Sequence, residues 1–426
     1  MKNLKKLLQL ILCMSICFSC TETDEFIDDP SVLKSAKEAG KTKVMPSTAT
    51  DASVKAQEDW QNINDALQNT EPGEVVQLAE GLFYLHKSII RWDFHGTLKG
   101  SGMDKTIIQT VPGELFNVEE CPSVNWSLEE NDGGFMFCFP HDFTDDERTV
   151  TVSDLSIVVS EPTTPYLRWK NTVKEMEFNS LQAIIVFYTN LNNDMANPIH
   201  LNVLYKNITI TGEKDEKYLY NSFSIFHGLA AYGLSNGTFE AKNVHIENAS
   251  GCITPFAFYG DDATVTVKNA SLKSCKWGIF SLLNHSWTIL NNEIENSTLG
   301  IVMLKQSVGG ELLEGPDGIS FVKDNKIHFM GVLGLGVQNL KNVQVKDNVF
   351  EGSGRFGGIA GLKGGNWIIT DNDLCGVAPV APFNCTIFLN NLKNSEINDN
   401  ANQVVGGPGA SDPTIIIGEG RECNED

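Results

Sequence analysis

Short runs of alternating apolar and polar residues recur through the second half of the chain. Each run ends in Asn, and such alternation is typical of a half-buried β-strand. The runs start 21, 22, 33, 23, 24 and 28 residues apart, so a basic unit of 21–24 residues repeats, with insertions in the longer gaps. A weaker copy, Ile208–Thr211, starts 36 residues before the first. The seven runs are Val244–Asn248, Val265–Asn269, Trp287–Asn292, Ser320–Asn325, Val343–Asn348, Trp367–Asn372 and Ser395–Asn400.

A second short apolar run follows about twelve residues later in several units, often beside Gly. Two to three short strands in 22 residues, with a perimeter of about 70 Å, predict one rung of a three-sided coil. Stacked rungs pair their strands in parallel, and the recurring Asn forms a ladder of side-chain amides along the stack. Leucine-rich and helical repeats do not fit, because their patterns are absent. The second runs are Trp277–Phe280, Leu299–Val302, Leu333–Gly336 and Phe356–Ile359.

Three segments carry a resemblance to a known superfamily: Val345–Phe350, Pro72–Leu85 and Leu98–Ile108. They are similar to the rungs and the N-terminal entry segments of the pectin-lyase-like proteins. The resemblance covers residues 59–417 and implies an all-β fold, a right-handed single-stranded parallel β-helix. We expect this domain over residues 58–420, with insertions near 111–146, 161–200 and 309–318. Helical spacing in Asp59–Thr70 predicts a short N-terminal capping helix.

The N-terminus resembles a bacterial lipoprotein leader. Lys2, Lys5 and Lys6 precede a short apolar stretch, and Cys20 follows small Ser19. The resemblance implies a signal peptide over residues 1–19, lipidation of Cys20 and a cell-envelope location, at the outer membrane of a Gram-negative bacterium. An ordinary cleaved signal is the alternative. Residues 20–57 are polar and are expected to form a flexible tether.

The net charge of −22 and the pI near 4.7 limit which partners the chain can bind. So acidic a chain is repelled by nucleic acid and by anionic membrane surfaces, so no nucleic-acid partner is expected and any membrane attachment is through the lipid. Anionic glycans are also disfavoured unless a metal or a local basic patch intervenes. We expect a monomer.

Ten cysteines are present, seven of them after the leader region. An exported chain can form disulfides, and Cys121–Cys138 and Cys375–Cys385 are candidate loop pairs. Seven cysteines leave at least one thiol unpaired.

Two cations are the candidate catalytic residues. Lys276 and Arg355 each precede an aromatic-Gly step, three rungs or about 14 Å apart, so both could line one outer groove. A polysaccharide lyase needs a base and a cation that neutralises a uronate carboxylate. Solvated turn cations are the plain alternative. The hydrolase motifs of the superfamily are absent, and Gly260–Asp262 with His285 has the wrong register for that chemistry.

Further residues are candidates for binding. Trp126, Trp169 and Trp277 are candidate sugar-binding platforms, whereas Trp287 and Trp367 share the rung-start column and are expected to pack in the core. A column of Asp is a candidate calcium site, and calcium is the one possible cofactor. Asp at such turns more often caps backbone N–H groups. The column is Asp324, Asp347, Asp371 and Asp399.

These observations leave two hypotheses for the function. The first is a surface or periplasmic lipoprotein that acts on or binds polysaccharide, with a lyase favoured over a hydrolase if it is catalytic. The second is a non-catalytic glycan-binding, adhesive or envelope-structural β-helix. A groove holding Arg or Lys together with carboxylates would favour the first, and a smooth outer face the second.

Overall fold

The computed structural model describes most of the chain after residue 39. The described ranges are 40–114, 116–117, 135–141, 147–160, 167–171, 174–178, 181–189, 200–213, 224–234, 237–257, 263–282, 286–305 and 318–423. Contacts divide the chain into two units, with the boundary between Thr254 and Pro255. The leader and Cys20 lie outside these ranges, as do most residues of the predicted insertions near 111–146 and 309–318, whereas half of the insertion near 161–200 is described.

The described part of the N-terminal unit stacks parallel strands behind one helix. Long strands each cover two faces of the coil: β8 pairs with β5 through Thr151–Ser153 and with β6 through Ser156–Val158. Asp154 bends β8 between the two faces with a φ of 58°. The elements are β1 (Lys41–Val44), α2 (Ala52–Gln68), β2 (Val75–Leu78), β3 (Gly81–Leu85), β4 (Ile89–Ile90), β5 (Thr97–Lys99), β6 (Thr106–Thr110), β7 (Phe135–His141), β8 (Arg148–Val158), β9 (Leu167–Asn171), β10 (Lys174–Phe178), β11 (Leu181–Thr189), β12 (Leu201–Thr211), β13 (Ile225–Leu234) and β14 (Thr238–Glu247); β15 (Ala249–Ala257) contains the boundary.

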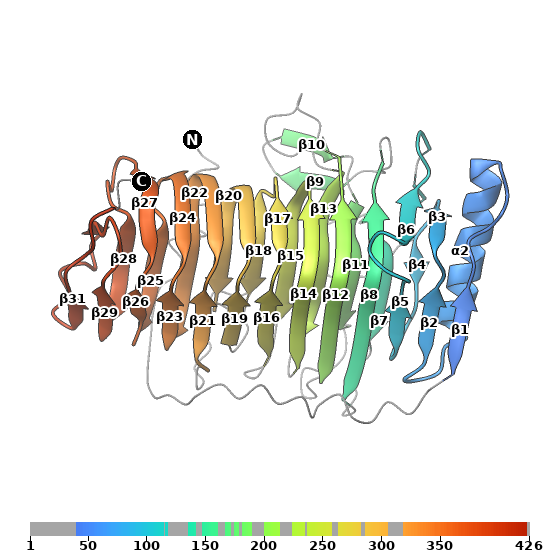
Figure 1. Ribbon diagram of the computed structural model, residues 1–426, viewed down its shortest axis with the longest axis horizontal. Coiled ribbons are helices and arrows are strands. Elements are labelled where there is room, and N and C mark those ends of the chain that lie inside the picture. Colours follow the sequence, from blue (N-terminus) through green and yellow to red (C-terminus); the bar gives the residue numbers. More distant parts are fainter. Residues whose placement is uncertain are drawn as a thin grey trace. The chain divides into compact units, whose positions relative to one another are not determined.

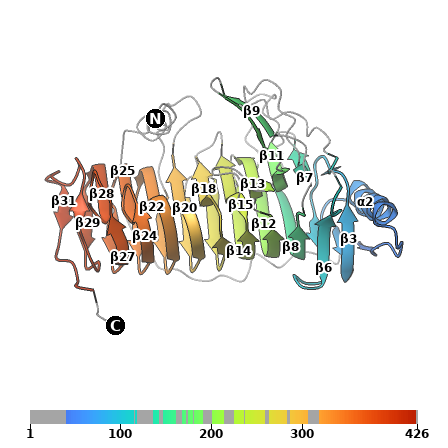
Figure 2. The same cartoon turned by 90° about the horizontal axis from the view of Figure 1, so that it is seen from above.

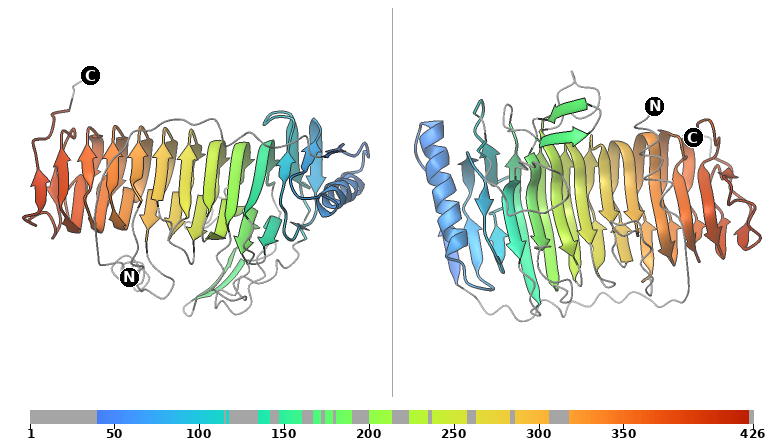
Figure 3. Two further views of the ribbon diagram at one scale, coloured as in Figure 1. Left: turned by 90° about the horizontal axis from the view of Figure 1, so that it is seen from below. Right: turned by 180° about the vertical axis from the view of Figure 1, so that it is seen from behind.

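The helix α2 covers the first strands, as the blue end of Figure 3 shows. Its buried residues include Ile63 and Leu67, at the spacing that the sequence predicted, so the capping helix is confirmed. The assignment of residues 20–57 to a tether is wrong at its end, however, because β1 and the first residues of α2 lie within it. Strand β1 pairs in parallel with β2, and Asp51 caps the helix by accepting a hydrogen bond from the Val54 N–H at 3.0 Å.

The strand pairings make the C-terminal unit a three-sided coil, and Figure 1 shows its strands following one another along the stack. One face is the succession β16–β19–β21–β23–β26–β29–β31, and the second is β17–β20–β22–β24–β27. The third follows β18–β20–β22–β25–β28–β30, where β20 and β22 contribute their second halves. The strands are β16 (Thr264–Lys268), β17 (Ser271–Lys273), β18 (Trp277–Leu282), β19 (Ser286–Leu290), β20 (Glu293–Leu304), β21 (Ser320–Lys323), β22 (Lys326–Lys341), β23 (Val343–Lys346), β24 (Val349–Gly354), β25 (Ile359–Gly365), β26 (Ile368–Thr370), β27 (Asp373–Pro379), β28 (Ile387–Lys393), β29 (Ser395–Asn398), β30 (Val405–Gly406) and β31 (Ile415–Ile417).

This parallel pairing confirms the predicted fold class, the parallel β-helix. It also confirms the Asn ladder, because Asn292, Asn325, Asn348, Asn372 and Asn400 are buried and joined in order. Each of the first four donates its side-chain N–H to the Oδ1 of the next at 2.8–2.9 Å, and its backbone N–H to the same oxygen at 3.0–3.1 Å.

The two predicted core tryptophans are confirmed. Trp287 and Trp367 are buried, and each indole N–H has a partner inside the coil. Trp287 donates to Ser281 Oγ at 2.7 Å, and Trp367 donates to the Leu340 carbonyl at 2.9 Å. These rings are therefore unavailable as ligand platforms.

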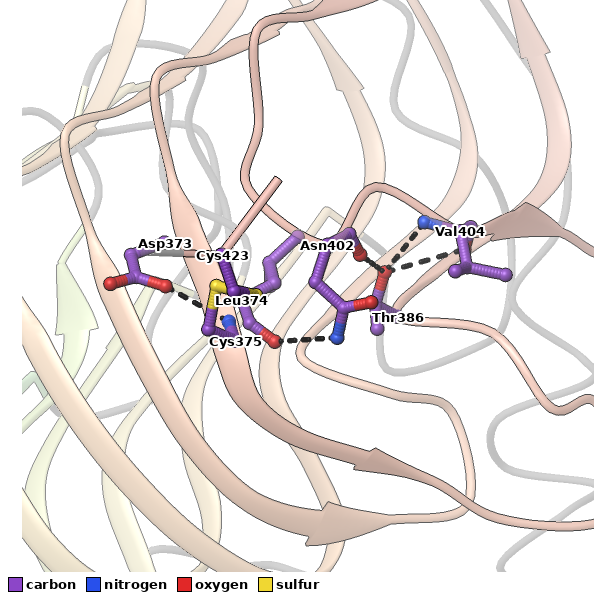
Figure 4. Close-up of a disulfide and its surroundings, with 7 residues drawn as sticks. All are labelled: Asp373, Leu374, Cys375, Thr386, Asn402, Val404 and Cys423. Atoms are coloured by element: carbon purple, nitrogen blue, oxygen red, sulfur yellow. Dashed lines mark hydrogen bonds between the residues drawn. A yellow bond between two sulfur atoms is a disulfide. The ribbon is translucent and has the colours of Figure 1, made fainter. Parts of the chain in front are cut away.

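The disulfide predicted between Cys375 and Cys385 is wrong. Cys375, in β27, is bonded to Cys423 of the C-terminal segment, with a Cα–Cα distance of 5.7 Å (Figure 4). The segment returns beside β27, where the Arg421 N–H donates to the Asn400 carbonyl. Cys138, Cys252 and Cys275 are also disulfide-bonded. Cys385 is a buried free thiol, which confirms that one thiol remains.

Candidate functional site

The third face of the C-terminal unit carries apolar side chains on both sides. Its inward positions form the core of the coil: Ile279, Ile301, Leu335, Ile359 and Ile387, all fully buried. The positions between them point outward, because side chains alternate along a strand. They contribute to a second apolar cluster, which we call the outer-face cluster. It consists of buried Val302, Leu304, Leu333, Phe356, Ala360, Cys385 and Phe388, with partly buried Phe280, Leu282, Leu299, Val332, Leu362 and Phe383 packed against it.

Lys276 lies at one end of this face, directly before β18. Its carbonyl accepts hydrogen bonds from the N–H groups of Thr298 and Leu299, at 3.1 and 3.0 Å. Its Nζ lies 5.5 Å from the centroid of the Trp277 ring, and that ring lies 5.3 Å from Phe280. Burial lowers the pKa of Lys276, because a charged ammonium is poorly solvated there. Lys276 and Trp277 thus form a cation–aromatic pair at the edge of the outer-face cluster.

Arg355 lies between β24 and β25, beside three phenylalanines. The rings of Phe356, Phe383 and Phe388 are 4.5–5.4 Å apart, centroid to centroid. The guanidinium carbon of Arg355 lies 5.9 Å from the centroid of Phe356. Its Nε is buried and has no hydrogen-bond partner. This is a second cation–aromatic group on the same face.

The structure places Lys276 and Arg355 on the same face but does not bring them together. Three pairing steps, β18–β20, β20–β22 and β22–β25, separate their rungs, which corresponds to about 14 Å. They also differ in register by one position. Trp277 is aligned with Leu299 and Leu333, which places Lys276 level with Val332. The residue bonded to the Val332 carbonyl is Phe356, whereas the Arg355 N–H donates to the Gly331 carbonyl. The two cations can contact different parts of one extended ligand, but not one atom.

The sequence analysis missed four polar residues at the far edge of this face. Gln338 points outward from β22, between Leu304 and Leu362 in register. The next position along each strand holds Lys305, Asn339 and Lys363. Both lysines are buried. Aligning the second apolar runs places Leu-Lys, Gln-Asn and Leu-Lys in one column, but the sequence does not show that the glutamine is buried without a partner.

The other predicted site residues are elsewhere. Trp126, Gly260–Asp262 and His285 lie outside the described residues. Trp169 belongs to β9 in the N-terminal unit, which pairs antiparallel with β10.

The aspartates of the predicted calcium column lie at the turns between strands. Asp324, Asp347, Asp371 and Asp399 all have positive φ, between 52° and 58°. Lysines of the preceding rung approach them: Lys323 Nζ lies 3.7 Å from Asp347, and Lys346 Nζ lies 3.5 Å from Asp371. Within the described ranges, no three His, Cys, Asp or Glu side chains converge to hold a metal. The column itself offers single carboxylates on successive rungs.

Two buried histidines of the N-terminal unit are poor candidates for acid–base chemistry. Burial lowers the pKa of His227 to about 3, and burial together with the nearby Arg148 lowers that of His141 to about 3. Both rings are therefore neutral above about pH 5, and neither can exchange a proton usefully near neutrality.

Comparison with known proteins gives fold likeness alone. No protein-family model matches the sequence, and the search of curated proteins gives no match. The chain is similar in fold to two A-modules of mannuronan C-5 epimerases from Azotobacter vinelandii, at 12% and 13% identity, covering 90% and 89% of this chain and 100% and 94% of those, with TM-scores of 0.44 and 0.43. A DFA-IIIase from Arthrobacter chlorophenolicus in complex with DFA-III gives 12% identity, coverage of 86% and 84%, and a TM-score of 0.49.

Proposed function

We propose that the protein binds polysaccharide along the third face of its C-terminal unit. The observation that carries this proposal is the pairing of cations with aromatic rings at two places on that face, Lys276 with Trp277 and Arg355 with Phe356. Aromatic and apolar surfaces with a few placed polar groups are typical of ligand sites. In Figure 2 the strands β18, β20, β22, β25 and β28 follow one another along this face. A regular row of strands suits an extended chain of sugars.

If the protein is catalytic, we favour a lyase. A lyase needs a base that abstracts a proton beside a uronate carboxylate, and a cation that neutralises that carboxylate. Lys276 suits the first role because its burial lowers its pKa, which makes more of the neutral amine available near neutral pH. Arg355, a permanent cation about 14 Å further along the face, suits the carboxylate of another sugar of the same chain, so neutralising the reacting carboxylate falls to a bound cation. Calcium remains the cofactor that such a site could use.

A non-catalytic binding role is the second candidate. The specific observation in its favour is the apolar character of the face from the rung of Lys276 to that of Arg355, where Phe280, Val302 and Ala360 lie in one row that includes Gly336. An apolar surface of this kind can hold a sugar chain without supplying a reacting group. A glycan-binding, adhesive or envelope-structural protein needs nothing further.

We also propose that the protein is exported and anchored to the cell envelope through lipid on Cys20, as its leader suggests. No helix in the described part of the chain is long and apolar enough to cross a membrane. Labelling cells with radioactive palmitate, followed by comparison of the wild type with Cys20→Ala, tests the anchor. Label that survives in Cys20→Ala would contradict it.

The proposed function is tested with the purified full chain and a panel of plant, algal and host polysaccharides, with calcium and with chelator. Affinity gels report binding, absorbance growth reports unsaturated uronides, and reducing ends report hydrolysis. We expect retardation by at least one polysaccharide, weakened in Lys276→Met and Arg355→Met. The matched control is Lys273→Met, an exposed lysine of β17 in the same rung. Absence of retardation across the panel would contradict the proposal, and reducing ends without absorbance would contradict the lyase.

A further inference from the structure

Gln338 is unusual among the described polar residues of the C-terminal unit. It is only 1% exposed, and neither its Nε2 nor its Oε1 has a hydrogen-bond partner. Buried amides are normally bonded, because leaving water without a replacement partner is unfavourable. Its neighbours in register, Leu304 and Leu362, are apolar and cannot supply one. The amide therefore has both a donor and an acceptor to offer to a ligand.

A column of lysine and asparagine lies directly beside this amide. The Lys305 N–H donates to the Gln338 carbonyl, and the Asn339 side chain donates to the Lys305 carbonyl at 3.2 Å. Asn339 and Lys363 have φ values of 55° and 52°, so both lie at the bend that ends this part of the face. Lys305 and Lys363 are one rung before and one rung after Gln338, about 10 Å apart. Both are at most 4% exposed.

Asn339, next to Gln338, also has an acceptor without a partner. Its Oδ1 is buried and has no hydrogen-bond partner, although its side-chain N–H does. Two adjacent residues thus hold one donor and two acceptors without partners, between two buried lysines. Lys305 and Lys363 place basic side chains on either side of these groups, which in a chain of net charge −22 gives an acidic ligand a locally favourable position.

We propose that Lys305, Gln338, Asn339 and Lys363 form a subsite for one acidic sugar residue of a polysaccharide. This inference rests on the proposed function and names the substrate class, a uronate-containing glycan. The Gln338 Nε2 donates to the carboxylate, and sugar hydroxyls donate to Gln338 Oε1 and Asn339 Oδ1. The two lysines supply positive charge that favours the carboxylate over a neutral group. A sugar matches this set because hydroxyls both donate and accept.

The test uses matched pairs of polysaccharides that differ only in charge. Each uronate polymer that the panel retains is compared with its carboxyl-reduced counterpart, in which the carboxylate has become a neutral hydroxymethyl group. We expect the uronate form to bind the full chain at least tenfold more tightly. This ratio should fall toward one in Lys305→Met and Lys363→Met, and Gln338→Leu should weaken both forms.

The controls separate this inference from the proposed function. Lys326→Met removes the same charge from an exposed position of β22 and should keep the tenfold ratio. Gln338→Leu provides a variant that is expected to fold even if a lysine variant does not. Equal binding of the charged and reduced forms, or unchanged binding by Gln338→Leu, overturns the subsite but leaves glycan binding intact. Failure to bind any glycan overturns the proposed function itself.

Discussion

Two sets of buried amides in the C-terminal unit differ in what surrounds them. The asparagines from Asn292 to Asn400 form one continuous ladder, closed by the Ala270 N–H at one end and by Gln403 at the other. Gln338, on another face of the coil, has no partner for either amide atom. The comparison teaches that burial of an amide alone does not identify its role. Partners within the protein indicate a structural role, and missing partners indicate a place for a ligand.

Repetition explains the difference. An Asn at the same corner of every rung finds the same group one rung away, so its bonds are satisfied by the repeat itself. Asn348, for example, also donates to the carbonyls of Val322 and Lys346, both at 2.9 Å. Gln338 interrupts a row in which the neighbouring rungs carry leucine. No repeat can satisfy a group that occurs once.

The largest expected effect comes from breaking the ladder at its centre. Asn348→Ala removes the acceptor of Asn325 and the donor to Asn372, and it leaves buried polar groups without partners. We expect the free energy of unfolding to fall by about 3 kcal/mol. Urea denaturation followed by tryptophan fluorescence measures this, since Trp287 and Trp367 are buried in the same unit.

The control for this prediction is Asn398→Ala, on β29. Its side chain bonds only to the exposed Glu396 carboxylate, at 2.7 Å. We expect a change of less than about 0.5 kcal/mol. Equal losses in the two variants would show that the ladder contributes no more than a surface amide.

An effect of opposite sign is expected from Gln338→Leu. Leucine matches the neighbouring Leu304 and Leu362 and removes an amide that is buried without partners. We expect the free energy of unfolding to rise by about 1–2 kcal/mol in the absence of ligand. The same denaturation experiment measures it. A loss of stability comparable to that of Asn348→Ala would mean that Gln338 is a structural amide after all.

The smallest expected effect concerns Lys276 and depends on pH. An unfolded lysine keeps its proton up to about pH 10.4, whereas burial lowers the pKa of Lys276 in the folded protein. Between the two pKa values the unfolded state binds more protons, so the free energy of unfolding rises with pH in that window. Lys276→Met should lack this rise, whereas the exposed control Lys273→Met should keep it. Denaturation at a series of pH values up to 10.4 compares them, and identical profiles for all three proteins would contradict the buried ammonium.

The sequence predicted the repetitive features well and the singular ones poorly. The rung length, the Asn ladder and the core positions of Trp287 and Trp367 follow from patterns that recur, so a single sequence displays them several times. The Cys375–Cys423 bond could not be predicted from spacing, because the C-terminal segment returns across 48 residues of sequence. Strand β1 was assigned to the tether because it is short and polar, and its pairing with β2 depends on tertiary contact.

The candidate site shows the same limit. Lys276 and Arg355 were found from their place beside aromatic-Gly steps, and the structure puts them on one face. Gln338 could not be ranked from the sequence, because its distinguishing property is the absence of partners in three dimensions. A glutamine in an apolar run is otherwise unremarkable to pattern analysis.

The most direct test of the account is to observe the two kinds of amide while a glycan binds. Protein with ¹⁵N in its glutamine and asparagine side chains is titrated with a retained uronate oligosaccharide, and the Gln338 and Asn348 amide signals are assigned by their loss in Gln338→Leu and Asn348→Ala. We predict that the Gln338 signals shift on binding while those of Asn348 stay in place. Saturable binding that leaves the Gln338 signals unchanged would contradict the account.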